Sequence, residues 1–133
     1  MKALSVQQPY ASEIARGEKF EEYRSRKTLY RGKLLVCSGQ RGSGDGPRGV
    51  AVAVVDVVDC FEGGPEGWVW FFGSVQKVRP FPVKGRLGFF EVPDRRIHVV
   101  GPPAVGPRRK TPGGVLQTPK VVFPKNAGNR FVY

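Results

Sequence analysis

The chain has 133 residues, the usual length of one domain, and its 40% hydrophobic and 25% charged residues are typical of a globular protein. No apolar run approaches the ~18–20 residues that cross a bilayer, and the N-terminus lacks the apolar core of a signal peptide, so we expect a cytoplasmic protein without a membrane partner. The formal net charge of +11 favours nucleic acid as the partner, while an anionic small molecule, or no charged partner, stays open.

The first elements are a short strand and a compact helix. The strand is predicted over "KALSV" at residues 2–6, and the helix follows in "QPYASEIARG". Pro9 suits the first helical turn and Gly17 the C-terminal cap. Tyr10 and Ile14 are four residues apart and give this helix a small apolar face.

The rest of the domain is predicted to be mostly strand. Short runs rich in β-branched and aromatic residues alternate with glycine and proline, at residues 19–25, 32–39, 49–61, 67–72 and 85–92. Five or six short strands with one or two short helices indicate the α+β class, arranged as a small mixed β-barrel. The G-x-G-x-x-G at 44–49 is followed by an alternating β-branched run, which favours a loop between strands over a dinucleotide site.

The composition changes at residue 94. Residues 1–93 contain 14 Lys and Arg against 10 Asp and Glu, whereas residues 94–133 contain eight against one and are rich in proline and glycine. We therefore expect a domain at 1–93 and a basic C-terminal extension at 94–133. The extension either docks in part, with short strands at "VVF" and "FVY", or stays a mobile arm that could engage protein partners.

Neither a metal site nor a cofactor is expected. Cys37 and Cys60 each lie in a strand-like apolar run, where a cysteine is usually a small buried hydrophobe. His98 is the only histidine, so the donors of a structural zinc site are missing.

The stretch "GEKFEEYRSRK" at 17–27 concentrates charge in a predicted strand. Strand alternation places Glu22 and Arg24 on one face with Phe20, and Glu21 and Tyr23 on the other. On composition alone this is an edge strand protected by charge against aggregation.

Its spacing indicates more. Gly17, Lys19, Glu22 and Arg24 fit the pattern G-x-K-x-x-E-x-R of the ASCH domain, a branch of the PUA-like superfamily. The flanking segments resemble the same family in the same order, from "KALSVQQPYASEIARGEK" through "YRGKLLVCSG" and "VAVAVVDVVDC" to "GWVWFF" and "RPFPVKGRLGFFEVP". The resemblance covers residues 1–93 and not 94–133.

This resemblance implies a PUA-like fold whose cleft binds nucleic acid, RNA more than DNA. Lys19, Glu22 and Arg24 would line the cleft, with Gln8 and Tyr10 nearby. Some relatives are ribonucleases or nucleoside amidohydrolases, so a hydrolase that uses Lys19 and Glu22 is the alternative, and whether the protein is an enzyme stays open. The amidohydrolase relatives have a threonine where this chain has Glu22, which favours binding.

Further binding residues are predicted around the motif. Trp68, next to Gly67, is the strand aromatic that we expect to stack on a base, although such aromatics usually belong to the core. Arg26 and Lys27 continue the basic series beyond Arg24 and are candidates for phosphate contacts.

Overall fold

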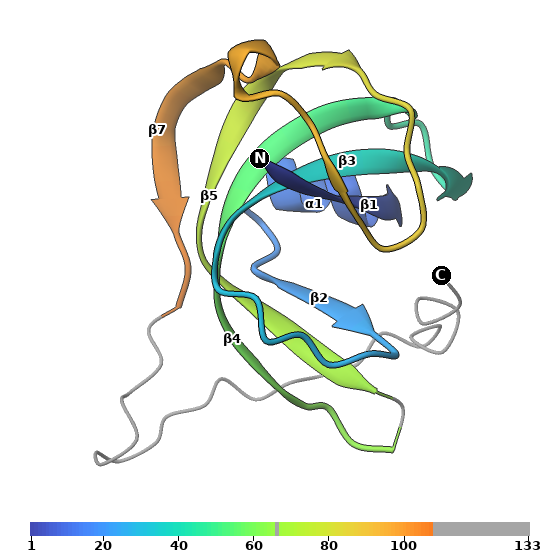
Figure 1. Ribbon diagram of the computed structural model, residues 1–133, viewed down its shortest axis with the longest axis vertical. Coiled ribbons are helices and arrows are strands. Elements are labelled where there is room, and N and C mark those ends of the chain that lie inside the picture. The colour runs from blue at the N-terminus through green and yellow to red at the C-terminus, as the bar shows by residue number, and fades with distance from the viewer. Residues whose placement is uncertain (66, 108–133) are drawn as a thin grey trace.

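The computed structural model describes residues 1–65 and 67–107, which form one curved sheet with a single α-helix (Figure 1). The elements in chain order are β1 (Lys2–Gln8), α1 (Tyr10–Ala15), β2 (Glu21–Arg24), β3 (Gly32–Gly42), β4 (Val50–Glu62), β5 (Trp68–Pro82), β6 (Phe89–Glu91), a 3-10 turn (Asp94–Arg96) and β7 (Val99–Val105).

The strands follow the order β2-β5-β4-β3-β1-β6, and β7 also pairs with β5. β1 runs parallel to β3, and the other pairings are antiparallel. The long strand β5 carries β2 on its first half, with Glu21 opposite Phe71, and β7 on its second half, with Ser74 opposite Val105.

The prediction of a mostly β fold with one early helix is confirmed, with seven strands in the described residues rather than five or six. Closure into a barrel is not confirmed. β2 has four residues and β6 has three, and each pairs along one side only. The two strands are therefore the ends of the sheet and do not pair with each other.

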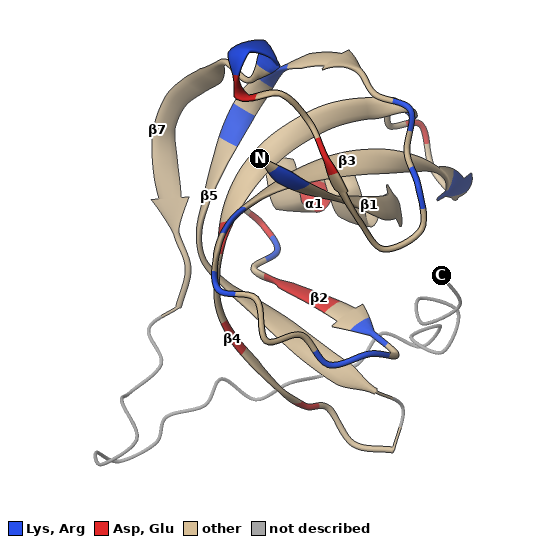
Figure 2. Ribbon diagram, in the orientation of Figure 1, with Lys and Arg blue, Asp and Glu red and all other residues tan. Residues whose placement is uncertain are grey.

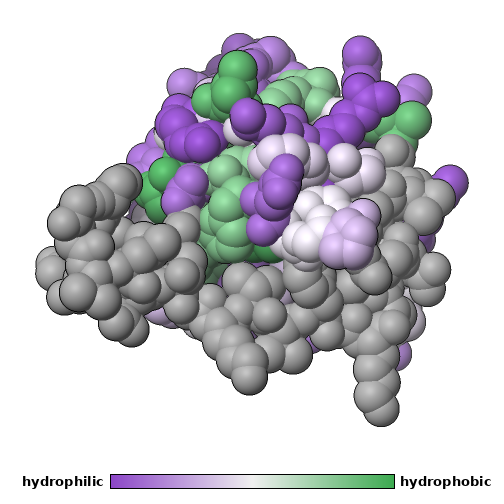
Figure 3. Space-filling view, turned by 90° about the horizontal axis from the view of Figure 1, so that it is seen from below, coloured by the Kyte–Doolittle hydropathy of each residue, from purple (hydrophilic) through white to green (hydrophobic). Residues whose placement is uncertain are grey.

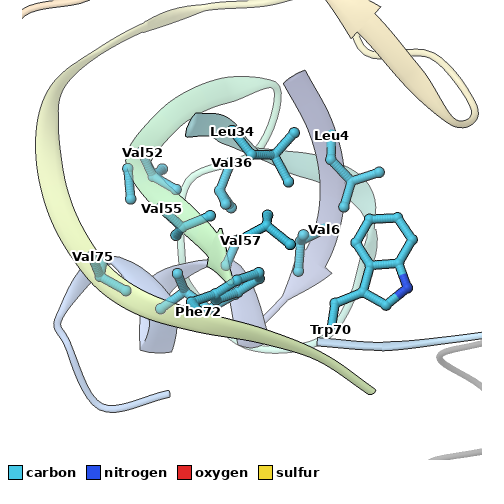
Figure 4. Packing of buried hydrophobic residues seen from close by; sticks show 13 residues of the cluster. Leu4, Val6, Leu34, Val36, Val52, Val55, Val57, Trp70, Phe72 and Val75 are labelled. Atoms are coloured by element: carbon cyan, nitrogen blue, oxygen red, sulfur yellow. The ribbon is translucent and has the colours of Figure 1, made fainter. Parts of the chain in front are cut away.

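The sheet is buried on both faces along its central strands. Val55 and Val57 of β4 belong to a cluster that includes Phe72 of β5, whereas Ala51 and Val54 belong to a second cluster. Figure 4 shows the first cluster, in which valines and leucines from β1, β3 and β4 lie over one side of Phe72. The nearly continuous apolar run of β4 follows from this burial on both sides.

The helix α1 forms where the sequence predicts it. Ala11 and Ile14 are fully buried in the first cluster, and Tyr10 packs at its edge. Gly17 has a φ of 74°, a left-handed conformation that glycine adopts readily, and its N–H donates to the carbonyl of Ile14 at 2.9 Å. The turn directs the chain into the motif strand β2.

Part of the predicted extension contributes to this sheet. The 3-10 turn and β7 lie beyond residue 93, and β7 pairs with the edge of β5. The predicted strands "VVF" and "FVY" lie outside the described residues.

Candidate functional site

The motif strand β2 presents two different faces, as the alternation predicts. Glu22 pairs with Trp70 across the β2–β5 ladder, and Arg24 pairs with Trp68. Directly opposed residues of a ladder point to the same side of the sheet. Glu22 and Arg24 therefore share a face with the two tryptophans.

Glu22 and Arg24 form a buried ion pair. Glu22 is 1% exposed and Arg24 7%, and Nη1 of Arg24 lies 3.1 Å from Oε2 of Glu22. The same Nη1 donates to the carbonyl oxygen of Ser5 on β1 at 3.2 Å, and the guanidinium carbon lies 5.8 Å from the ring centre of Trp70. Arg24 thus connects β2 to β1, two strands that do not pair with each other.

Lys19 occupies an aromatic environment. Its Nζ lies 4.6 Å from the ring centre of Tyr23 and 5.4 Å from that of Tyr10, and 3.7 Å from Oε1 of Glu21. A cation over ring faces is attracted by their quadrupoles, more strongly when water is excluded. The structure therefore brings Lys19 and Tyr10 together.

Gln8 makes its contacts inside the protein. Its side chain is buried, Nε2 donates to the carbonyl oxygen of Pro47 at 2.7 Å, and Oε1 accepts from the N–H of Ser12 at 3.0 Å. A Cβ added to Gly46 would lie 2.5 Å from Nε2, so the glycine-rich loop passes directly over the amide. Gln8 thereby ties the start of α1 to that loop.

A hollow of about 380 Å³ lies between the two ends of the sheet; we call it the seam hollow. One wall is the end of β2 and the segment after it, the other is the start of β6, and β1 and β5 form the floor. The lining residues are Leu4, Arg24, Ser25, Arg26, Lys27, Thr28, Trp70, Leu87, Gly88 and Phe89. The site therefore exists where the sheet does not close.

The seam hollow combines cations with aromatic rings. Arg24, Arg26 and Lys27 supply positive charge, and Trp70 and Phe89 lie with ring centres 5.6 Å apart. Trp70 is buried and its Nε1 donates to the carbonyl of Arg26 at 2.9 Å, which fixes the ring. Phe89 is 39% exposed, so part of its side chain is accessible from the hollow. This arrangement suits a planar, negatively charged molecule.

Two figures show how charged and hydrophobic residues are distributed over the molecule. In Figure 2, lysines and arginines mark both the segment after β2 and the loop before β6. Figure 3 shows the molecule from below, where hydrophobic surface lies between hydrophilic side chains. The accessible surface is thus of mixed chemistry.

Trp68, the aromatic that the sequence favours for stacking, does not line the seam hollow. It packs against the edge of the first core cluster, and Nζ of Lys27 lies 5.4 Å from its ring centre. Trp70 and Phe89 line the hollow instead. The alternation of β5 predicts that Trp68 and Trp70 share a face. It does not predict which of the two tryptophans lies beside β1 and β6, where Leu4 pairs with Phe89 at the hollow.

The described residues were also compared with the requirements of a metal site and of a membrane-spanning helix. Among residues 1–65 and 67–107, no group of three or more His, Cys, Asp or Glu side chains could hold a metal ion. Over the same residues, no helix has the length and apolar character needed to cross a membrane.

Comparison with protein families agrees with the motif. The family model of the ASCH domain matches residues 4–70. The chain belongs to the ASCH family. The matched residues include the motif and the Leu4 and Trp70 sides of the seam hollow, but not the wall at 87–89. A comparison of this ASCH domain with curated proteins finds no match.

Proposed function

We propose that this ASCH domain binds RNA and holds one nucleotide of a single strand in the seam hollow. The observation that carries the proposal is the convergence of three cationic side chains and the exposed ring of Phe89 on one hollow. Bases stack on aromatic rings whatever their sequence, and Arg or Lys beside the ring can hold the phosphate.

The whole chain supports an anionic partner. Its net charge is +11, and cationic proteins gain affinity for nucleic acids by releasing condensed counterions. Family membership favours RNA over DNA, and a PUA-like fold is part of the same proposal.

The motif contacts favour binding over hydrolysis. A general base must reach the proton that it removes. The carboxylate of Glu22 is instead bonded to Arg24 and is 1% exposed, and Lys19 is enclosed by Tyr10 and Tyr23. A hydrolase that uses Lys19 and Glu22 is the alternative, and release of product from RNA or from acylated nucleosides would identify it.

The test is binding of a labelled single-stranded RNA to the full chain and to variants of Phe89. Phe89→Leu keeps an apolar side chain but removes the ring face, and loss of one base stack lowers affinity by about tenfold or more. Phe89→Tyr keeps the ring face and should bind like the parent protein.

Arg26→Ala combined with Lys27→Ala removes two cations from the same hollow. We expect weaker binding and a smaller salt dependence, by about 0.7 in the logarithmic slope for each lost phosphate contact. Lys77→Ala with Arg79→Ala removes the same charge from exposed positions of β5 outside the hollow. Equal losses in both double variants, or no RNA binding at micromolar concentration, would refute the proposal.

A further inference from the structure

We propose that the bound RNA strand continues from the seam hollow over Leu87 into a second hollow, where Arg41 and Arg86 hold the phosphates of neighbouring nucleotides. The inference rests on the proposed function and extends it from one nucleotide to a strand with a defined path.

The second hollow, which we call the outer hollow, measures about 300 Å³. It lies where the ends of β1 and β3 meet the loop before β6, with Ser5 and Gln40 on the strand side and Arg86 on the loop side. A Cβ added to Gly85 would lie 2.6 Å from Oγ of Ser5, so the loop closely approaches β1 beside this hollow. In Figure 2, basic residues mark the end of β3 and the neighbouring loop.

The two hollows are neighbours through one side chain. Leu87 lines both of them and is 79% exposed. A strand that leaves the seam hollow across this leucine meets Arg86 directly, because Arg86 precedes Leu87 in the loop. An exposed leucine between two basic hollows can pack against a sugar or base while the cations hold the phosphates.

Arg41, near the end of β3, and Arg48, in the connection to β4, have different contacts. Arg48 is used by the fold, since its Nη1 donates to the carbonyl of Arg41 at 2.7 Å and its Nη2 to that of Gly44 at 3.1 Å. These bonds hold the loop in position. The side chain of Arg41 stays exposed, and within residues 1–65 and 67–107 neither Arg41 nor Arg86 has a side-chain hydrogen bond or an ion pair.

The charge of the path has one sign. The linings of the two hollows together contain five Lys or Arg side chains and no Asp or Glu. A chain of phosphates complements such a surface along its length, whereas a single nucleotide engages only the seam hollow. The length of the RNA is therefore the variable that distinguishes the path from the nucleotide pocket.

The experiment compares a uridine dinucleotide with an oligouridine of about ten nucleotides, within the usual range of single-strand sites. Arg41→Ala with Arg86→Ala should weaken binding of the long RNA about tenfold at low salt and lower its logarithmic salt slope by about 1.4. Binding of the dinucleotide, which extends no further than Arg86, should weaken much less. Lys77→Ala with Arg79→Ala is the matched control, and the melting temperature of each variant shows that it is folded.

The path is wrong if both double variants weaken the long RNA equally, if Arg41→Ala with Arg86→Ala has no effect, or if this variant weakens the dinucleotide as much as the long RNA. Failure of the proposed function looks different. In that case the parent protein binds neither RNA, and the Phe89 variants behave alike.

Discussion

Arg24 is the residue on which the site depends most. It neutralises Glu22, donates to Ser5 and contributes to the seam hollow, all with one guanidinium. A buried charge without its partner is strongly unfavourable, so the partners of Arg24 matter for stability before they matter for binding.

Glu22→Gln tests this dependence. The substitution leaves Arg24 buried without its carboxylate, and we expect it to lower the free energy of unfolding by about 3 kcal/mol. Glu18→Gln, in an ion pair with Arg16 that is exposed on both sides, should change stability far less. Urea unfolding of the two variants measures the difference. Similar small losses would show that the Glu22–Arg24 pair does not stabilise the fold.

The two cysteines should differ in reactivity. Cys37 is buried, and this burial raises the pKa of its thiol from the ordinary 9.0 to about 12, whereas Cys60 is half-buried. At pH 8 a chromogenic disulfide should therefore modify one thiol in the folded protein and two in urea, because only thiolates react. Two rapidly reacting thiols without urea would contradict the buried position of Cys37.

The same pKa shift affects stability at high pH. The folded state favours the protonated thiol of Cys37, so the unfolded chain loses this proton first as the pH rises. The contribution of Cys37 to stability is complete below about pH 9 and should decrease between about 9 and 12. Cys37→Ala should remove this part of the pH dependence in urea unfolding, and an unchanged pH profile would contradict it.

At the scale of elements, the sequence predicts what depends on neighbours in the chain. The helix α1 follows from Pro9, Ile14 and Gly17, and the two faces of β2 follow from alternation. The seam hollow depends instead on pairing between distant segments, such as Leu4 with Phe89, for which the local pattern carries no signal. The sequence therefore points to Trp68 and gives no signal for Phe89, which lines the hollow.

β7 shows the same limit in another form. Its sequence contains Pro102 and Pro103 and cannot order itself, which is what its composition predicts. The edge of β5 supplies the missing hydrogen-bond partners, and an edge strand tolerates proline because one side of it needs no ladder. A strand that forms only by pairing with another strand cannot be predicted from its own composition.

At the scale of the molecule, the open sheet and the candidate site are one feature. The sheet curves until the segment after β2 and the start of β6 lie on either side of the seam hollow, and Arg24 bridges from β2 to β1 beside it. Completing the ladder would fill the space that the proposed ligand needs. The short end strands β2 and β6 therefore belong to the function proposed for this domain.

This geometry predicts a pattern of local stability. β2 and β6 are short and pair on one side, whereas β3 and β4 pair on both sides and carry the core. Backbone amides of the end strands should exchange with deuterium faster than those of the central strands, because their opening costs less free energy. Arg24→Lys keeps the charge but loses the planar guanidinium that contacts both Glu22 and Ser5. It should therefore speed amide exchange further in β2, while β4 stays protected.

Ligand binding should slow amide exchange in both walls of the seam hollow at once. An RNA held between the segment after β2 and the start of β6 stabilises the state in which both walls are in place. Residues 24–28 and 87–89 are far apart in sequence and line the same hollow, so their amides should become protected together when RNA is added. Hydrogen exchange followed by mass spectrometry resolves the two segments. Protection of only one of them would place the ligand on one wall and contradict binding across the seam hollow.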